Sequence, residues 1–246
     1  MESIALLVLL LGILTVLGIP KMKRRTPLPV TNATNNIEPY GDTYAKYYDV
    51  LSYDPERRAF QETLTDRFRD ANSETLEIGC GLGHLVNHTG GTGLDKSAAM
   101  VQAASERYPS AHFVVGDAQN ADLFPVERFT HIFCFGPPLF LMERKDLFFH
   151  SAKKWLEPGG ILCITVRAHT AERSLVPSNL NYRATWTDRT HWQETFQHNG
   201  EKFKVKHMFF PETEETVLRM AKRAGLTLQE KVAFNQEIIA IFKAGI

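Results

Sequence analysis

A short apolar run that ends in alternating glycines constrains the fold more than any other feature of this 246-residue chain. Thr75-Leu76-Glu77-Ile78 has the character of a buried strand, and Gly79-Cys80-Gly81-Leu82-Gly83 follows it directly. Glycines at these positions permit a tight turn, and they let backbone N–H groups face a ligand with no Cβ in between. The segment therefore predicts a strand, a ligand-facing loop and a helix that begins near His84.

The rest of the chain alternates between short apolar runs and helical patterns. This alternation predicts an α/β fold with a doubly wound, mostly parallel sheet. The last two strands are joined through Asn235 and are expected to pair antiparallel at the sheet edge. The expected helices are 55–69, 98–107, 144–156 and 212–224, and the expected strands are 93–94, 112–115, 130–135, 161–166, 226–234 and 237–243, with a turn at 158–160.

Three acidic residues fall at the expected carboxyl ends of successive strands, where open α/β sheets bind ligands. Glu77 lies two residues before the first glycine, and a carboxylate there suits a cationic ligand. Asp95 is placed to hold both hydroxyls of a ribose, and Asp117 is placed to accept from an exocyclic amine. Taken singly, each position has a structural alternative: a chance glycine turn, or helix N-capping by Asp95 or Asp117.

Several ligand and partner classes are excluded or disfavoured. A dinucleotide loop would read G-x-G-x-x-G, but the sixth position here is His84. The chain has 28 basic and 28 acidic residues, so its net charge is zero, which argues against a nucleic-acid partner. Cys80, Cys134 and Cys163 form no metal-binding spacing and no disulfide framework, and no metal is expected.

The combined motifs resemble those of class I S-adenosylmethionine-dependent methyltransferases over roughly residues 40–243. The resemblance implies a seven-stranded, Rossmann-like sheet with S-adenosylmethionine as cofactor. It further implies that the glycines approach the methionine part, Asp95 the ribose and Asp117 the adenine. The expected cofactor-binding residues are Tyr48, Glu77, Gly79, Cys80, Gly81, Gly83, Asp95, Lys96, Gly116, Asp117 and Ala118.

An N-terminal tyrosine segment, residues 40–49, resembles the one that closes over the cofactor in small-molecule members of that family. We expect Tyr48 to contact the cofactor and Tyr44 to line the substrate pocket. Simple core packing of these tyrosines is an equally good explanation.

No strong catalytic motif is present, and methyl transfer from a sulfonium needs none, because alignment and exclusion of water supply much of the barrier reduction. His169 follows the expected fifth strand and is the best general-base candidate, although a solvated loop histidine explains it more simply. The fourth strand ends in Gly136-Pro137-Pro138, without the polar residue that amino-methylating relatives acting on nucleic acid or glutamine carry. Phe140, just beyond it, is expected in the substrate pocket.

A long insertion at residues 168–210 separates the fifth strand from the last helix, and it is rich in aromatic residues. We expect it to form the substrate side of the site, with Tyr182, Trp186 and Trp192 as pocket walls. A local core under a long loop is the alternative. Residues 202–206 alternate charge and bulk as a half-buried strand would.

The N-terminus differs in character from the remainder. Residues 1–25 read as a hydrophobic helix with a basic flank, residues 26–39 as a linker and residues 40–246 as the catalytic domain. We predict a single-pass membrane anchor through residues 3–22, with Lys21 to Arg25 keeping the domain on the cytoplasmic side. A cleaved signal peptide and a helix lying in the membrane interface are the alternatives.

The sequence thus predicts a membrane-anchored methyltransferase that acts on a small-molecule acceptor, with a lipophilic acceptor at the membrane surface as the finer expectation. A protein methyltransferase acting on membrane-associated proteins and a non-catalytic cofactor-binding adaptor are the alternatives. The acceptor atom and the oligomeric state do not follow from the sequence.

Overall fold

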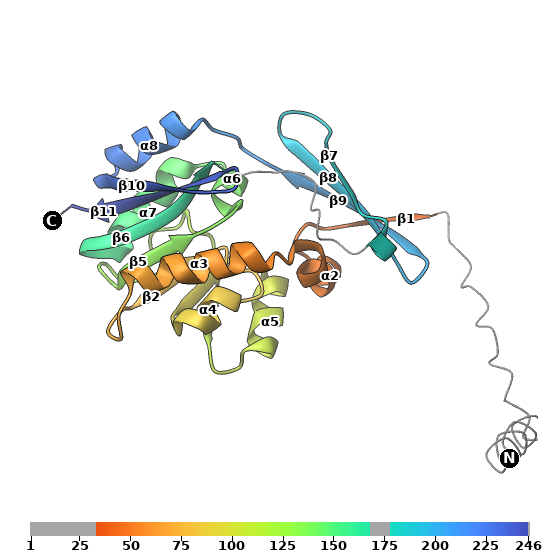
Figure 1. The fold of residues 1–246 in the computed structure, drawn as a ribbon, viewed down its shortest axis with the longest axis horizontal. Helices are drawn as coiled ribbons and strands as arrows, with labels where there is room; N and C mark the ends of the chain where they lie inside the picture. The colour runs from red at the N-terminus through yellow and green to blue at the C-terminus, as the bar shows by residue number, and fades with distance from the viewer. Residues whose placement is uncertain (1–32, 168–177, 246) are drawn as a thin grey trace, which may run out of the picture.

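Two β-sheets organise the computed structural model, which describes residues 33–167 and 178–245. The larger sheet has seven strands and the smaller has four. Figure 1 shows the large sheet between two layers of helices, with the small sheet beside it.

The large sheet has the strand order β10-β11-β6-β5-β2-β3-β4. Its first five strands along the chain pair in parallel, and β10 and β11 add an antiparallel pair at one edge. The strands are β2 (Thr75–Ile78), β3 (Thr92–Asp95), β4 (His112–Val115), β5 (Phe129–Cys134), β6 (Leu156–Arg167), β10 (Leu226–Phe234) and β11 (Glu237–Ala244). This is the predicted seven-stranded, Rossmann-like fold with its antiparallel closing pair, and the prediction is confirmed.

The predicted turn at residues 158–160 is a bulge within a strand instead. β6 runs continuously from Leu156 to Arg167, but its pairing with β5 jumps from Phe129↔Leu156 to His131↔Ile161. The residues between the two pairs loop out of register, and Gly159 supplies the positive φ of 81° that the bulge needs. The sequence therefore predicts the local change of chain direction correctly. It does not predict that β6 stays paired in the sheet on both sides of it.

Helices cover both faces of the large sheet. Figure 1 shows α3, α4 and α5 on one side and α7 and α8 on the other. Their ends carry conventional caps: Asp54 accepts from the backbone of Arg57, Ser97 from Met100 and Thr213 from Thr216. The helices are α2 (Asp42–Ser52), α3 (Pro55–Phe68), α4 (His84–Thr89), α5 (Ala98–Arg107), α6 (Pro138–Leu141), α7 (Lys145–Trp155) and α8 (Glu214–Arg223).

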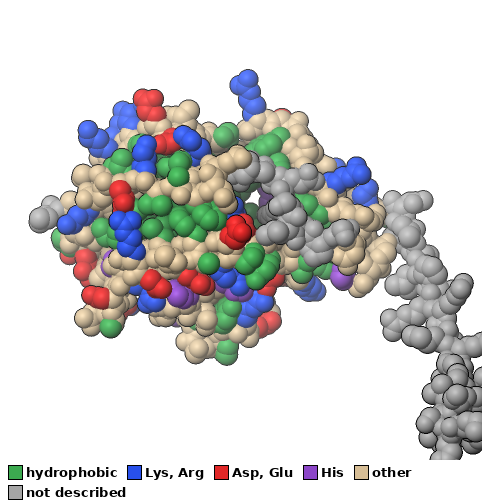
Figure 2. Space-filling model, in the orientation of Figure 1, with side chains coloured by type: hydrophobic (Ala, Val, Ile, Leu, Met, Phe, Trp, Pro, Cys, Tyr) green, Lys and Arg blue, Asp and Glu red, His purple; other side chains and the backbone are tan. Residues whose placement is uncertain are grey.

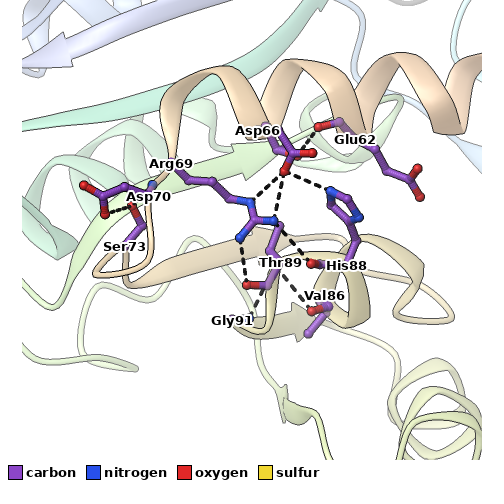
Figure 3. Close-up of polar contacts among 10 residues, drawn as sticks. Glu62, Asp66, Arg69, Asp70, Ser73, Val86, His88, Thr89 and Gly91 are labelled. Carbon is purple, nitrogen blue, oxygen red and sulfur yellow. Dashed lines mark hydrogen bonds and ion pairs between the residues drawn. The ribbon is translucent and has the colours of Figure 1, made fainter.

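A polar cluster ties the end of α3 to the end of α4, the helix that follows the glycine loop (Figure 3). Asp66 accepts from Arg69 Nε at 2.9 Å and lies 3.0 Å from His88 Nε2. Arg69 also donates to the carbonyl oxygens of His88 and Thr89. These contacts hold α3 against α4, which begins directly after the glycine loop.

The small sheet has the order β1-β9-β8-β7 and collects most of the predicted insertion. It consists of β1 (Thr34–Ile37), β7 (Arg183–Trp186), β8 (His191–His198) and β9 (Glu201–Met208), preceded by the short 3₁₀ helix η1 (Ser178–Leu180). β9 alternates buried and exposed positions as predicted. Its buried face packs with Tyr44 and Leu51 of α2 to form a second core.

Residues 34–37 correct the predicted linker. They form β1, which pairs in parallel with β9 from Thr34↔Lys202 to Ile37↔Val205. Their polar composition suggested a linker, and three of the four residues are indeed exposed. Backbone pairing with a distant edge strand does not depend on apolar side chains, so composition alone did not reveal it.

The predicted membrane anchor, residues 1–25, lies outside the described residues. Within residues 33–167 and 178–245, no helix is long and apolar enough to cross a bilayer. On the face shown in Figure 2, acidic and basic side chains are interspersed, and hydrophobic side chains collect near the edge of the large sheet formed by β6, β11 and β10.

Candidate functional site

The glycine turn after β2 has the backbone geometry that the sequence predicts. Gly79, Gly81 and Gly83 have φ values of 71°, 53° and 77°, a region that side-chain-bearing residues rarely adopt. The N–H groups of Gly79 and Cys80 donate to the Leu94 carbonyl at 2.8 and 3.2 Å. The turn is thereby fastened to the end of β3.

Glu77, at the end of β2 beside this turn, is half-buried, and its Oε2 atom is fully buried. Its Oε2 atom has no hydrogen-bond partner among the described residues. Burial raises the pKa of Glu77 well above its usual range, and the nearby Asp95 carboxylate acts in the same direction. A buried carboxylate with one oxygen unpaired is a site for a cationic group that enters from outside the chain.

Asp95, at the end of β3, accepts hydrogen bonds from the backbone. Its carboxylate takes the Gly81 N–H at 3.0 Å and the Ser97 N–H at 2.9 Å. Burial raises the pKa of Asp95, and these hydrogen bonds oppose the rise. The N-cap of α5 is Ser97, so Asp95 does not fill the capping role that was its structural alternative.

Asp117 follows β4 and forms an ion pair with Lys96, whose Nζ lies 2.8 Å from Oδ2. Gln119 donates to the same carboxylate from both its backbone and its side chain. Partial burial opposes the shift, but Lys96 and Gln119 lower the pKa of Asp117 below its usual value. Asp117 is therefore ionised at neutral pH.

Asp95 and Asp117 line a cavity of about 950 Å³, a volume within the range of small-molecule and cofactor sites. The N-terminal segment before and within α2 forms its opposite wall. The predicted cofactor residues on its lining are Tyr48, Gly79, Gly81, Asp95, Lys96, Gly116, Asp117 and Ala118.

A second cavity of about 420 Å³ adjoins the first, and Gly79, Gly81 and Tyr48 line both. Its walls include Glu77, Cys80 and Trp192 from the predicted sites. All three cysteine thiols are free and buried, and burial raises the pKa of the Cys80 thiol, so this side chain contributes packing at neutral pH.

The segment that carries the tyrosines is held over the glycine turn by polar contacts. Ser97 Oγ donates to the Tyr40 carbonyl at 2.6 Å. Asp49 pairs with His84 Nε2 at 2.9 Å and with Arg107. Tyr48 thus reaches both cavities from a helix that is fixed at both ends.

Four of the predicted substrate-pocket residues line neither of the two cavities. Tyr44 is fully buried in the second core, where its hydroxyl donates to Glu194, and Tyr182 donates to the same carboxylate. Phe140 packs into the main core, and Trp186 is 38% exposed at the edge of the small sheet. The aromatic composition of the insertion predicted a pocket wall. The register of each strand, however, decides whether a side chain faces the pocket, the core or solvent.

Of the other predicted residues, one lines no cavity and one is not described. Gly83 lines neither cavity, and a Cβ there would lie 2.5 Å from Phe113, so its absence allows close helix packing. His169, the predicted base, lies outside the described residues. Sequence reasoning missed His207, which lines both cavities, as does Tyr40 of the predicted tyrosine segment. The alternation of buried and exposed residues along β9 could have revealed His207, because this residue shares the buried face of the strand with Phe203 and Val205.

The residues present fit S-adenosylmethionine. The unpaired Glu77 oxygen suits a positively charged amino group, and Gly79 and Gly81 present backbone without a side chain to both cavities. Asp95 and Asp117 add polar acceptors along the first cavity. Among the described residues, no group of three His, Cys, Asp or Glu side chains is placed to hold a metal ion.

We expect Asp117→Asn to weaken S-adenosylmethionine binding by about 3–10-fold, because a partly exposed acceptor contributes on the order of 1 kcal/mol. Calorimetric titration measures the effect. Asp122→Asn is the matched control, since Asp122 also pairs with a lysine but is 87% exposed and lines neither cavity. Equal affinities of the two variants would contradict a cofactor contact at Asp117.

Comparison with known proteins agrees with this geometry. A family model described as a methyltransferase domain matches residues 75–160, the segment from β2 to the bulge of β6. Among curated proteins, the phosphoethanolamine N-methyltransferase of Plasmodium falciparum is 32% identical over 116 residues, which is 44% of each chain. The chain spans about half the length of the curated relatives it matches.

Two solved structures share the fold over most of the chain. The CcbJ methyltransferase from Streptomyces caelestis aligns with a TM-score of 0.64 and 18% identity, covering 84% of this chain and 98% of that one. The amino pentose methyltransferase CalS10 from Micromonospora echinaspora, solved with S-adenosylmethionine bound, aligns with a TM-score of 0.61 and 17% identity. It covers 86% of this chain and 100% of that one.

Proposed function

We propose that this chain is an S-adenosylmethionine-dependent methyltransferase that transfers the methyl group to a small-molecule acceptor. The observation that carries the proposal is the second cavity, which adjoins the cofactor cavity at Gly79, Gly81 and Tyr48. Its volume of about 420 Å³ suits a small molecule and is small for a folded protein surface. The phosphoethanolamine and amino pentose methyltransferases are named for small-molecule acceptors, which supports the same class.

The cofactor would be held along the carboxyl ends of the parallel strands. Glu77 would pair with the amino group of the methionine part, Asp95 would accept from the ribose hydroxyls, and Asp117 would accept from the adenine amine. S-adenosylmethionine supplies a methyl group already activated on a positively charged sulfur. The chain's own residues then have to bind, orient and keep water out.

The described walls of the second cavity suit those tasks. Trp192 and Phe209 provide apolar surface from the small sheet, and Phe135 provides it from the end of β5. Gly136 donates its backbone N–H to Thr165 Oγ1 at 2.9 Å, which fixes the loop between β5 and α6. Holding two reactants in line within such walls supplies up to about 7–11 kcal/mol of the barrier reduction.

Transfer of a labelled methyl group from S-adenosylmethionine tests the proposal. The protein is incubated with methyl-labelled S-adenosylmethionine and a small-molecule extract or a protein extract. We expect label in a small-molecule product that is separated from unreacted S-adenosylmethionine, and none in precipitated protein. Label confined to precipitated protein would favour the protein methyltransferase alternative. Binding of the cofactor without any turnover would favour the non-catalytic adaptor.

The finer proposal places the reaction at a membrane surface through residues 1–25. It rests on the apolar run and basic flank of the sequence alone. Anchoring would raise the local concentration of a lipophilic acceptor, as any tether does.

Removal of residues 1–25 tests the membrane setting. We expect turnover on acceptors dissolved in lipid vesicles to fall by about 10-fold or more, because tethering gains of 10²–10⁴ are lost with the tether. Turnover on water-soluble acceptors is the matched control and should stay unchanged. An equal rate of the two proteins on vesicle-borne acceptors would contradict the anchor.

A further inference from the structure

A buried carboxylate, Glu194 of β8, lies at the centre of the small sheet, close to both cavities. Its side chain is fully buried. It accepts from the hydroxyls of Tyr44 at 2.5 Å and Tyr182 at 2.7 Å, and it lies 2.9 Å from His207 Nε2 on the neighbouring strand β9. None of the sequence motifs of the cofactor site includes this cluster.

His207 extends from this cluster to the boundary between the two cavities and lines both. The side chain is 2% exposed, and its Nδ1 atom is buried without a hydrogen-bond partner in the part of the chain that the structure describes. The other residues common to both cavities are Tyr40, Tyr48, Gly79, Gly81, Phe135 and Pro137. Within this set, His207 alone carries a basic side-chain nitrogen.

The hydrogen-bond partner of one imidazole nitrogen decides whether the other nitrogen carries a proton. When Nε2 carries the proton and donates to Glu194, Nδ1 keeps a lone pair. The two tyrosine hydroxyls fix the carboxylate, and the carboxylate fixes the ring. An imidazole held in this way keeps a proton-accepting nitrogen on the side of the ring away from Glu194.

The charge around the second cavity favours a cationic acceptor. Among the described residues, five carboxylate side chains line it against two arginines, and four remain when Glu77 is assigned to the cofactor. Glu237 is buried, and Arg57 pairs with it at 3.0 Å. Among the described residues, the groups that face the His207 ring are Tyr40 and Tyr44, with ring centroids 5.3 and 5.5 Å away, and Glu194.

We propose that His207 is the general base of this methyltransferase, that Glu194 is its positioning residue, and that the acceptor group is an amine. The proposal rests on the proposed small-molecule function and names its acceptor class. An amine bound in the second cavity as its ammonium form would give up one proton to His207 Nδ1. The base strength fits, because imidazole, with a pKa near 6.5, neutralises an ammonium far more readily than it ionises an alcohol.

The step balances in atoms and charge. The ammonium nitrogen loses one proton to His207 and regains its lone pair. That nitrogen then bonds to the methyl carbon while the bond from the carbon to the sulfonium sulfur breaks, with its electron pair staying on sulfur. The positive charge passes to the methylated nitrogen, and the imidazolium returns its proton to water.

The kinetic test uses a defined set of probes: ethanolamine, phosphoethanolamine and benzylamine as amines, with phenol and thiophenol as oxygen and sulfur acceptors. Release of S-adenosylhomocysteine is followed between pH 6 and 9. We expect turnover with amines only. His207→Asn should lower kcat by about 100-fold, within the range for a lost general base, while the Kd for S-adenosylmethionine stays within about 3-fold.

The pH profile separates a base from a structural residue. Wild-type kcat should depend less steeply on pH than that of His207→Asn, because the ring accepts the proton that a base from solution must otherwise remove. In His207→Asn it should keep rising toward the pKa of the amine, and added imidazole should partly rescue His207→Ala. Glu194→Gln should lower kcat by about 10-fold and leave the KM for S-adenosylmethionine unchanged.

His191→Asn is the matched control. His191 lies on the same sheet and also pairs with a carboxylate, with its Nδ1 2.9 Å from Asp188, but it lines neither cavity. Its substitution should change none of these quantities. A His207→Asn rate within about 3-fold of wild type on a methylated amine would overturn the inference and leave the proposed function intact. Methylation confined to phenol or thiophenol would overturn the amine assignment.

A spectroscopic readout needs no acceptor. Nitrogen NMR of the histidine-labelled wild-type protein should show His207 protonated at Nε2 and bare at Nδ1 above neutral pH, with the His207→Asn spectrum giving the assignment. A ring protonated at Nδ1 would overturn the inference even if none of the probes were methylated. Failure of the protein to bind S-adenosylmethionine would instead overturn the proposed function.

Discussion

Gly79→Ala is expected to abolish measurable S-adenosylmethionine binding and to lower the free energy of unfolding by about 3 kcal/mol. Gly79 has a φ of 71°, which costs a residue with a Cβ about 1–2 kcal/mol. The added methyl group would also lie 2.3 Å from Cγ of Pro138, a rigid ring in the first turn of α6. Overpacking of this kind costs about 1–3 kcal/mol more. The turn can relieve the clash only by moving out of the cofactor cavity that it lines.

Gly90→Ala provides the control for Gly79→Ala. Gly90 has almost the same φ, 72°, at the end of α4, and a Cβ there would meet nothing within 4 Å among the described residues. We expect it to lose only the conformational cost of about 1–2 kcal/mol and to bind the cofactor as the wild type does. Thermal unfolding and calorimetric titration of both variants measure the two quantities. Normal cofactor binding by Gly79→Ala would contradict the placement of the cofactor at this turn.

The second large effect is expected for Glu77→Gln, which should lower S-adenosylmethionine affinity by more than about 100-fold. The Glu77 oxygen that lacks a partner is buried, and we assign it to the amino group of the methionine part. Removing one member of a buried, hydrogen-bonded charge pair costs about 2–5 kcal/mol. The same variant should be more stable than the wild type without cofactor, because an amide does not have to ionise in a buried site.

The pH dependence of Glu77 has a definite sign. Its pKa in the folded protein is raised, so its favourable contribution to stability is complete below the ordinary glutamate range. That contribution is lost as the pH rises through the raised pKa. Cofactor binding has the opposite dependence, because a cation needs the carboxylate. Affinity should therefore fall as the pH drops below the raised pKa.

Thermal unfolding and titration with S-adenosylmethionine, each over a pH series, check the predicted pH dependence of stability and of affinity in wild type and Glu77→Gln. Glu56→Gln on the exposed face of α3 serves as the control. The wild-type affinity should vary with pH and that of Glu77→Gln should not. A stability gain of 1 kcal/mol corresponds to about 2–4 °C in Tm for a domain of this size. A Glu77→Gln variant that binds as tightly as Glu56→Gln would contradict the assigned role.

The cofactor side of the site was predictable because its signals are local. A strand that ends in glycines fixes both the turn and the position of Glu77. The parallel order of the sheet then brings Asp95 and Asp117 to the same edge. Each inference needs only strand boundaries, which short apolar runs define well.

The acceptor side was less predictable because it depends on pairing between distant segments. β1 pairs with β9 across more than 160 residues, and a polar strand gives no signal for such pairing. Tyr182 and Trp186 were expected in the pocket from their aromatic character alone. One residue of register decides whether such a side chain meets the cavity, the core or solvent.

His207 illustrates the same limit. The alternation of residues 202–206 predicts a half-buried strand, and extending it by one step places His207 on the buried face. Its importance, however, arises from Glu194, which lies on the paired strand β8 and contacts Tyr44 from α2. Three segments meet at this carboxylate, and the sequence shows none of their contacts.

Calorimetric titration of the full chain with S-adenosylmethionine at pH 7.5 tests the central claim most directly. The proposed placement predicts one site per chain, with a Kd in the range of about 1 µM to 1 mM that is typical of enzyme ligands. It also predicts that Glu77→Gln removes most of this affinity while Glu56→Gln keeps it. No binding by the wild-type protein, or equal binding by both variants, would contradict the claim.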